Sequence, residues 1–493
     1  MKKRYLIYII LVWVILIIPF AGMTFWPTTT TSENTELAKW PKWKEDGTWN
    51  QDYLEEAGEY FEDHFAFRQY FVTANALLKG NVFQTGATDQ VIVGKDDWLY
   101  FGGTVNDYRG RNLLSEREMY NVIHNITLMQ NYVQQNGSQF VLMVIPNKNT
   151  LYDEAMPYYV KPGDTSNLER LTELLTERGV EFIDVKELFQ NEEEVLYFHR
   201  DSHWNNKGAV LAYNALMEKL GREHETYLNV PYELEKSHVG DIDEMLYPFG
   251  FELEEEYVYD KEFSFDYVNE VKDNMDAWIQ TNNPQKDGSM LMYRDSFGES
   301  LLPFVADEIG QGYFSRLVPY NLTQIEELHP QYVVIEKVER NIQDFAKRIP
   351  IMEGALTENR MAPEVKTKSS IEAKKEGSYL SVEGKIEEKY LEDNSDIYVA
   401  VRDMATQETR TYQAFYKITE DGKGNGYKLY LKGTSVPQGE FHISVITENS
   451  GQAKIVASKD IKMGIKGEND EKEDSGNAVD RMYEHQCGSL RKE

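Results

Sequence analysis

Hydrophobic and polar positions repeat with two different periods through the first three quarters of the chain. Residues 139–145 form a continuous apolar run, which is typical of a strand buried on both faces. The segment before this run has helical spacing and extends from a capping box, Ser115 with Glu118, to a stop at Asn136. Further strand-like runs occur at 180–185, 196–198, 289–293, 317–320 and 332–335, with helical segments at 167–178 and 205–220. This alternation predicts a parallel sheet with helices on both faces.

The spacing changes after about residue 364. Short segments of alternating apolar and polar residues are separated by turns rich in Gly, Asn and Asp, as is typical of antiparallel strands. These segments are 397–401, 412–418, 427–431, 441–446 and 454–458. Their spacing predicts a small β-sandwich after the α/β part of the chain.

The N-terminus combines a basic cluster, Lys2 to Arg4, with an uncharged apolar run over residues 5–22. At ~1.5 Å per residue, such a run is just long enough to cross a bilayer core of about 30 Å. The basic residues before it and the Thr/Ser/Glu-rich stretch after it predict a cytoplasmic N-terminus, with the rest of the chain outside the cell membrane. A cleaved signal peptide is the alternative. The sequence AGM at residues 21–23 is a poor cleavage site, so we favour a single-pass, uncleaved anchor.

These patterns divide the chain into five predicted parts. They are a basic end with a transmembrane anchor (1–27), a linker (28–48), an α/β domain (49–363), a β-sandwich domain (364–463) and a charged tail (464–493). The tail has no apolar periodicity and is predicted to be disordered.

Composition excludes several classes of function. Of the 493 residues, 41% are hydrophobic and 13% are aromatic, which is too many for a disordered chain. The 52 basic and 83 acidic residues give a net charge of −31, so a nucleic-acid partner is disfavoured. The single cysteine, Cys487, lies in the tail, which argues against a disulfide framework, a zinc ribbon, an Fe–S site and a cysteine nucleophile.

Two polar segments follow predicted strands and are expected at the same edge of the sheet, where ligands of α/β proteins bind. They are HRDSHWN at residues 199–205 and YRDSFG at residues 293–298. Asp201 and His203 stand two positions apart, so an extended backbone points both side chains the same way. A carboxylate beside an imidazole can orient it to deprotonate a serine hydroxyl such as that of Ser296. The helix predicted after Ser296 would offer backbone N–H groups to an oxyanion.

The residues alone leave other interpretations open. Ser296 is well placed to be the N-cap of the helix that follows it, and His203 could simply pack beside Trp204. His199, Asp201 and His203 stand at i, i+2 and i+4, which on one face of a strand is a reasonable zinc set with an open position. Spacing alone does not choose between nucleophilic and metal chemistry.

The segment DSHWN at 201–205, followed by KGA at 207–209, resembles the D-x-H-W signature of the AlgX/AlgJ-like, or DHHW, branch of the SGNH-hydrolase-like acetyltransferases. Further pieces match in order between about Trp49 and Arg340, namely 63–68, 94–100, 145–148 with 151–152, 240–241 and 294–297. The resemblance implies an SGNH-hydrolase-like α/β fold for residues 49–363, with a parallel sheet flanked by helices.

Carried over to this sequence, the resemblance implies a role for each of three residues. Asp201 orients His203, His203 is the general base, and Ser296 is the nucleophile. No metal or other cofactor is then expected, and His199 becomes a residue beside the site or facing the substrate.

Five further residues are candidates for binding the substrate or an oxyanion: Asn147, Lys148, Arg294, His199 and Trp204. Asn147 and Lys148 follow a central strand at the expected ligand edge, although a turn is an equally good reason for them. Arg294 stands beside Ser296, where it is expected to bind a polar substrate or to pair with a carboxylate.

Members of this family O-acetylate polysaccharides outside the cytoplasmic membrane. The resemblance therefore implies transfer of an acetyl group through an acyl-enzyme on Ser296 to an exopolysaccharide or a cell-wall glycan. A multi-pass membrane O-acyltransferase is the implied acetyl donor, and the polysaccharide is the acceptor. Two alternatives stay open: a carbohydrate acetylesterase that uses the same three residues, and a non-catalytic scaffold of a polysaccharide assembly complex. The β-sandwich is expected to bind glycan, to position the catalytic domain or to act as a spacer.

Overall fold

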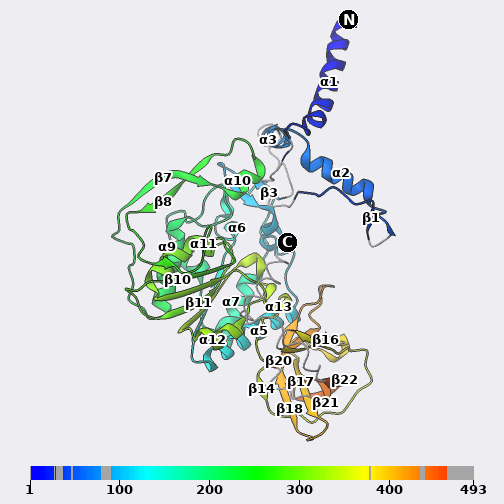
Figure 1. Ribbon diagram of the computed structural model, residues 1–493. Helices are drawn as coiled ribbons and strands as arrows, with labels where there is room; N and C mark the ends of the chain where they lie inside the picture. The colour runs from blue at the N-terminus through cyan, green and yellow to red at the C-terminus, as the bar shows by residue number, and fades with distance from the viewer. Residues whose placement is uncertain are drawn as a thin grey trace.

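The computed structural model describes residues 2–26, 28, 37–45, 48–78, 90–376, 379–432 and 439–463. Residues 29–36 and 46–47 of the predicted linker and the whole predicted tail, with Cys487, lie outside these residues. Figure 1 shows three parts in chain order: an N-terminal helical part, an α/β part and a β-rich part at the opposite end from the N-terminus.

A seven-stranded sheet with the order β6-β5-β13-β11-β12-β10-β9 forms the centre of the α/β part. Five strands are parallel: β5 (Gln139–Ile145), β6 (Phe182–Ile183), β11 (Ser289–Tyr293), β12 (Gln311–Ser315) and β13 (Tyr332–Val338). At one edge, β10 (Trp278–Asn282) pairs antiparallel with β12, and β9 (Asp266–Tyr267) pairs antiparallel with β10. The sheet is therefore mixed, and the prediction of a parallel sheet is right only in part. The cause is the short connection 283–288 between β10 and β11, because a parallel connection needs a crossover of a dozen or more residues.

The strand predicted at 317–320 is wrong, since the strand in that region is β12, which ends at Ser315. Pro319 lies in the predicted run and has no N–H to donate to a ladder. The strand predicted at 196–198 is reduced to an isolated bridge between Tyr197 and Trp204.

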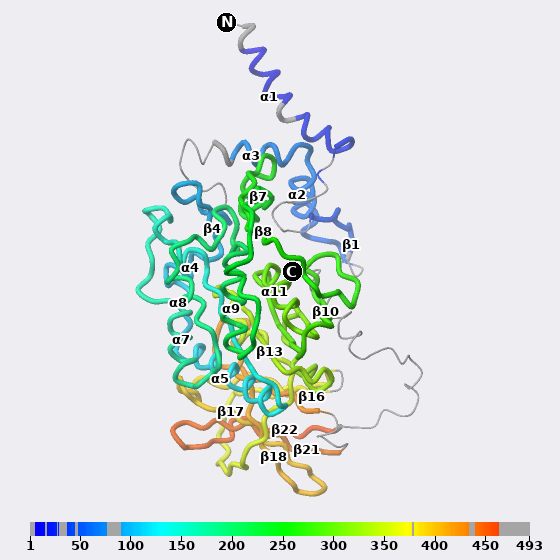
Figure 2. The backbone as a smooth tube through the Cα atoms, turned by 90° about the vertical axis from the view of Figure 1, so that its left-hand side faces the viewer, coloured from blue at the N-terminus to red at the C-terminus, as the bar shows by residue number. Residues whose placement is uncertain are grey.

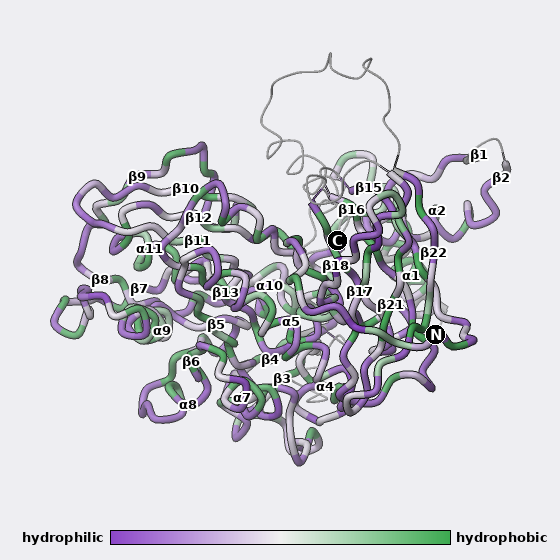
Figure 3. Tube along the Cα trace, turned by 90° about the horizontal axis from the view of Figure 1, so that it is seen from below, coloured by the Kyte–Doolittle hydropathy of each residue, from purple (hydrophilic) through white to green (hydrophobic). Residues whose placement is uncertain are grey.

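Helices cover both faces of the sheet, as Figure 3 shows from below, with α9 and α11 on one side and α5 on the other. One face carries α5 (Glu116–Gln135), α7 (Asn167–Arg178), α12 (Ile325–Leu328) and α13 (Asp344–Lys347). The other face carries α8 (Val185–Gln190), α9 (Asn206–Lys219) and α11 (Gly298–Glu308). Alternate residues of each central strand enter the two cores, so Phe140 packs toward α5 and Val141 toward α9. Burying each such side chain contributes about 1.5–3 kcal/mol to the free energy of folding.

Local signals in the sequence account for several helix ends. The capping box Ser115–Glu118 is present at the start of α5, and a second one, Ser166–Glu169, begins α7. Gly179 ends α7 with a φ of 64°, a left-handed conformation that costs glycine little.

The β-rich part contains two antiparallel sheets that share a hydrophobic core. One sheet has the order β14-β18-β17-β21-β22, formed by Leu356–Thr357, Thr409–Gln413, Asp396–Asp403, Gly439–Asn449 and Gln452–Met463. The other has the order β15-β16-β20-β19, formed by Glu372–Glu376, Tyr379–Lys385, Gly426–Lys432 and Phe415–Lys417. Helix α5 joins this part to the α/β part: Arg117 donates to the Ser395 carbonyl (2.6 Å), and the ring of His124 stacks on Tyr416 (3.6 Å between centroids).

The N-terminal helix α1 (Lys2–Gly22) projects from the rest of the molecule (Figures 1 and 2). Its residues 5–22 have a mean hydropathy of 2.5 and are long and apolar enough to cross a membrane, which is compatible with an anchor or with a signal sequence. Helices α2 (Tyr53–His64) and α3 (Arg68–Leu78) follow, and α3 reaches the α/β part where Thr73 Oγ1 accepts the Phe249 N–H (3.1 Å). A small ladder of β1 (Lys44–Glu45) with β2 (Thr48–Trp49) precedes α2.

Smaller elements stand above the carboxyl ends of the parallel strands. They are the hairpin of β3 (Val91–Val93) and β4 (Leu99–Phe101), helices α4 (Val105–Tyr108), α6 (Lys148–Leu151) and α10 (Asp241–Leu246), and the hairpin of β7 (Tyr232–Val239) and β8 (Leu253–Tyr259). Figures 1 and 2 show α10 and the β7–β8 hairpin at the end of the α/β part that faces α1, whereas the β-rich part lies at the other end.

Candidate active site

Ser296 lies in the turn between β11 and α11, and hydrogen bonds of the preceding residue, Asp295, stabilise this turn. Asp295 accepts the N–H of Phe297 (3.0 Å) and that of Val338 (2.8 Å), while its own N–H donates to Glu336 (2.8 Å). Burial and the charge of Asp295 raise the pKa of Glu336 well above its usual value. Glu336 is therefore neutral beside a charged Asp295, and the two carboxyl groups do not repel each other. The turn is therefore tied to the end of β13 and presents Ser296 at the carboxyl edge of the sheet.

Asp201, His203 and Ser296 form a chain of hydrogen bonds. His203 Nδ1 lies 2.7 Å from Asp201 Oδ1, and His203 Nε2 lies 2.8 Å from Ser296 Oγ. With Nδ1–H donating to the carboxylate, Nε2 is left to accept the serine O–H, which is the arrangement that a general base needs. Ser296 is not the N-cap of α11, because that position is Phe297, so this alternative is wrong.

Asp201 has a second imidazole partner that the sequence did not reveal. Its Oδ2 accepts from His238 Nε2 (2.9 Å) and from the Asp241 N–H (2.9 Å), and its Oδ1 also accepts the His203 N–H (2.7 Å). The His238 ring stacks on Phe198, with 3.7 Å between centroids and 3° between planes. His238 is 37 residues from Asp201 on another element, so no local spacing could indicate the contact.

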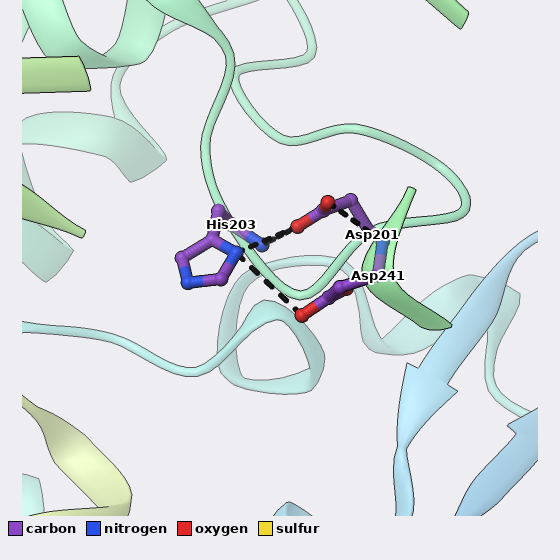
Figure 4. A group of neighbouring side chains, drawn as sticks. All are labelled: Asp201, His203 and Asp241. Carbon is purple, nitrogen blue, oxygen red and sulfur yellow. Dashed lines mark hydrogen bonds and ion pairs between the residues drawn. The ribbon is translucent and has the colours of Figure 1, made fainter. Parts of the chain in front are cut away.

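A second carboxylate stands beside His203 (Figure 4). Asp241 Oδ2 lies 3.6 Å from His203 Nδ1 and accepts the Ser202 O–H (2.5 Å). In the sequence, Asp241 lies in the matched segment 240–241, and no spacing gives it a role of its own.

The electrostatics of the chain favour a basic His203. Burial by itself disfavours the imidazolium, but the charge of Asp201 and its hydrogen bond outweigh burial and raise the pKa of His203 above 6.5. Burial likewise disfavours the Asp201 carboxylate, but His203 and His238 outweigh it and hold the pKa of Asp201 well below its usual value. Asp201 is therefore a permanent anion that stabilises positive charge on either histidine.

These side chains open into a cavity of about 760 Å³. Its wall includes Ser296, His203, Asp201 and Trp204, with Phe101, Phe198 and Phe304 supplying apolar surface and Arg316 and Arg340 supplying positive charge. A cavity of this size, with mixed polar and apolar lining, is typical of small-molecule binding sites.

Four of the five secondary candidates do not line this cavity; Trp204 does. The Trp204 indole N–H donates to Ser300 Oγ (2.7 Å), which ties the loop to α11. Lys148 is buried behind the loop, where its ammonium donates to the carbonyls of Phe198 (3.1 Å), His199 (3.0 Å) and Asp201 (2.5 Å). Burial lowers the pKa of Lys148 more than the nearby carboxylates raise it, and the net result is a pKa of about 8. The structure thus places Lys148 under the backbone of the site and outside the cavity.

Asn147, Arg294 and His199 are also placed away from the cavity. The Asn147 N–H donates to Glu339 (2.8 Å), and Arg294 is buried with its guanidinium on the carbonyls of Asn274 and Asp276. The ring of His199 stacks on Trp98, with 4.4 Å between centroids.

The zinc set proposed from spacing is therefore not assembled, because His199 points elsewhere. Among the described residues, Asp201, His203 and Asp241 bring ligand-type atoms within 4.8 Å of one another. Asp201 and His203 already satisfy each other by a hydrogen bond, and His203 also contacts Ser296.

Comparison with known solved structures gives distant similarities. The chain is 17% identical to PatB1 of Bacillus cereus over 51% of this chain and 96% of that one, with a TM-score of 0.42. It is 13% identical to a DHHW family protein of Eubacterium siraeum (52% and 92% covered, TM-score 0.39) and 18% identical to the O-acetyltransferase domain of Pseudomonas putida AlgJ (51% and 92%, TM-score 0.35). No curated protein matches the chain.

A family model also matches part of the chain. Residues 91–252 match the SGNH hydrolase-like domain of the acetyltransferase AlgX. The matched stretch contains Asp201, His203, His238 and Asp241, and it ends before Ser296. This match agrees with the resemblance that the sequence motifs indicated.

Proposed function

We propose that the chain is an extracytoplasmic, membrane-anchored O-acetyltransferase that transfers an acetyl group through Ser296 to hydroxyls of an exopolysaccharide or cell-wall glycan. The observation that supports this most strongly is the continuous hydrogen-bonded chain from Asp201 through His203 to Ser296, which opens into a 760 Å³ cavity. The family of residues 91–252 supports the acetyl-transfer chemistry.

In the first half-reaction, Ser296 Oγ attacks the carbonyl carbon of the acetyl donor while its proton passes to His203 Nε2. Asp201 stabilises the imidazolium that forms. The backbone N–H groups of Ser296 and of Gly298, the first residue of α11, have no hydrogen-bond partner among the described residues, so both are free to donate to the oxyanion. The intermediate then collapses, the leaving group takes the proton from His203, and an acetyl ester on Ser296 is left.

In the second half-reaction, His203 Nε2 takes the proton of a sugar hydroxyl, whose oxygen attacks the acetyl ester. Ser296 Oγ leaves and regains that proton, so the protein returns to its starting state. Water in place of the sugar would give an esterase by the same steps.

The position of the site supports transfer from a membrane donor. The cavity includes Glu244 and Met245 of α10, and α10 lies at the end of the α/β part that faces α1. If α1 stays in the membrane, the cavity lies on the membrane side, where a multi-pass O-acyltransferase would present its acetyl group.

The test compares the full chain in detergent with its Ser296→Ala variant, using a chromogenic acetyl ester. Intact-mass analysis then looks for acetyl on the Ser296 peptide. We expect Ser296→Ala to lose hydrolysis and the acetylated peptide together. Ser289→Ala, at the other end of β11, is the matched control and should keep both. Activity that survives Ser296→Ala would remove the nucleophile from the proposal, and no activity in the wild type would favour a scaffold. Acetyl release to water alone, with no transfer to glycan, would favour an esterase.

A further inference from the structure

The last turn of α1 is joined to the connection between α2 and α3. The Ala66 N–H donates to the Pro19 carbonyl (3.1 Å), and the ring of Phe20 packs against that of Phe61 (4.8 Å between centroids). A Cβ on residue 22 would lie only 2.7 Å from the Ala66 Cβ, so this close approach requires the glycine that stands there. The start of α3 is therefore fixed to the end of the apolar helix.

Exposed aromatic side chains surround this joint. They form a group that we call the aromatic patch: Phe25, Trp26, Trp40, Phe67, Tyr70, Phe71 and Phe249, each more than 40% exposed. Ring contacts connect the patch to its surroundings, as between Trp26 and Phe67 (6.3 Å) and between Tyr70 and Phe249 (4.0 Å). By contrast, Trp98 and Trp204 of the α/β part are buried. A contiguous apolar surface of this kind indicates a contact with a protein or a membrane.

Charge divides the two helices that follow α1. Helix α3 has one charged residue, Arg68, at its first position, whereas α2 has five acidic residues: Glu55, Glu56, Glu59, Glu62 and Asp63. In Figure 1, α2 leads away from the end of α1, while α3 stays beside it, and Figure 2 shows α3 lying across that end. The surface next to α1 is therefore aromatic and nearly uncharged, and the acidic surface begins farther away.

We propose that the aromatic patch lies in the lipid headgroup region, on the outer face of the membrane that α1 spans, with α3 lying along the bilayer surface. This inference rests on the anchor of the proposed function and adds the surface of the folded part that contacts lipid. Aromatic rings are enriched at this depth, because the rings of Trp and Tyr combine an apolar body with a polar tip.

The contacts of α1 favour lipid over a protein as the occupant of this surface. Pro19 belongs to the apolar run 5–22, which is just long enough to cross the bilayer core. Ala66 is hydrogen-bonded to Pro19, so the start of α3 must lie where α1 leaves the hydrocarbon. Lipid headgroups surround a single spanning helix at that depth, and an uncharged aromatic surface needs no specific partner there.

The same helix connects this surface to the candidate active site. Thr73, a buried residue of α3, accepts the Phe249 N–H (3.1 Å), and Phe249 lies in the loop that follows α10. Helix α10 contributes Glu244 and Met245 to the wall of the cavity. With Phe71 in the headgroup region, α3 would hold the cavity at a fixed position beside the bilayer, within reach of a membrane donor.

The first test uses the full chain reconstituted in phosphatidylcholine vesicles. Tryptophan fluorescence is quenched by lipids that carry bromine either close to the headgroup or at the bilayer centre. In the double variant Trp26→Phe/Trp40→Phe, quenching by the shallow bromine should fall by about half, because both indoles are at the headgroup level. Trp13→Phe, within α1, should reduce only the quenching by the deep bromine. Trp278→Phe, on β10, is the matched control and should change neither.

A second probe does not depend on tryptophan. An environment-sensitive fluorophore is attached to Phe71→Cys after the single native cysteine has been removed by Cys487→Ser. In the same vesicles its emission should be blue-shifted and quenched by the shallow bromine. The fluorophore on Arg402→Cys, at an exposed position of the β-rich part, is the control and should report water. Thermal unfolding checks that each variant is folded.

Shallow quenching that is unchanged in Trp26→Phe/Trp40→Phe, or a fluorophore at residue 71 that reports water, would overturn the lipid contact and leave the patch to a protein partner. Failure of the anchor is distinguishable from this result. A full chain that an alkaline wash removes from the vesicles would overturn the anchor of the proposed function together with the lipid contact. A chain that stays on the vesicles while residue 71 reports water would overturn the lipid contact alone.

Discussion

Two groups of polar residues meet at the carboxyl edge of the sheet, and they do different things. The proposed reacting group, Asp201, His203 and Ser296, faces the cavity and is hydrogen-bonded side chain to side chain. The support group, Lys148 and Arg294, is buried and bonded mainly to backbone carbonyls. A charged residue at the ligand edge of an α/β sheet is therefore not evidence of substrate contact by itself, because irregular backbone at that edge also needs donors.

The largest difference between activity and stability is expected at His203. Replacing His203 with Gln removes the base but keeps most of the volume, so kcat/KM for a chromogenic acetyl ester should fall by about 10³-fold or more. The midpoint of thermal unfolding should change little, because the His203 side chain is hydrogen-bonded to Asp201 and Ser296 and to no backbone carbonyl. A large loss of stability with modest loss of activity would place His203 in the support group.

Lys148 should show the opposite behaviour. Lys148→Met keeps the length of the side chain but leaves three carbonyls without their donor, so the free energy of unfolding should fall by about 3 kcal/mol. Urea unfolding measures this, with the exposed Lys462→Met as control. An unchanged free energy of unfolding combined with a raised KM would instead mean that Lys148 contacts the substrate.

His238 stands between the two groups, because it contacts Asp201 but not Ser296. Since His203 must be neutral to act and its pKa is raised, activity should increase with pH through a value above 6.5. In His238→Ala, Asp201 no longer shares its charge with a second imidazole, so the pKa of His203 should increase further and the acid limb should move to higher pH.

The expected loss of kcat/KM in His238→Ala is about tenfold at pH 6.5 and smaller at pH 8.5. Glu254 and Glu256 also face His238, so the profile should be recorded at two ionic strengths. His442→Ala, which removes a partly exposed histidine of the β-rich part, should leave the profile unchanged. A uniform loss at all pH values would show that His238 only supports the fold.

Trp204→Phe should give the smallest effect. Phe keeps a six-membered ring, but the pyrrole part of a buried indole and its hydrogen bond to Ser300 are lost, so the free energy of unfolding should fall by about 2 kcal/mol and kcat/KM by less than tenfold. The exposed Trp43→Phe serves as the control for tryptophan removal. A loss of activity as large as that of His203→Gln would mean that the indole contacts the substrate directly.

The sequence predicted a good part of this arrangement. Buried strands such as β5, the capping box of α5 and the β-rich part after the α/β part follow from apolar spacing and turn residues. The D-x-H-W segment with the RDSF segment predicted that Asp201, His203 and Ser296 converge, and the structure brings them within hydrogen-bond distance. Their catalytic roles stay predictions, as do the domain boundaries.

Other features could not be predicted in the same way. The antiparallel pairing of β10 depends on the free edge of β12, which is formed only when the sheet assembles. The placement of Arg294 depends on loop carbonyls 18 to 20 residues away. Four of the secondary candidates were chosen from their position after a strand. That position determines at which edge of the sheet a residue lies, but not the direction in which its side chain points.

By itself, the sequence determined the period of each segment, the apolar N-terminal helix and the residue types available at one edge of a sheet, since these depend on contacts close along the chain. Only the tertiary structure decided that His238 shares Asp201 with His203 and that Lys148 supports the backbone of a loop. Those outcomes depend on contacts between residues tens of positions apart, where the packing of whole elements selects the partner.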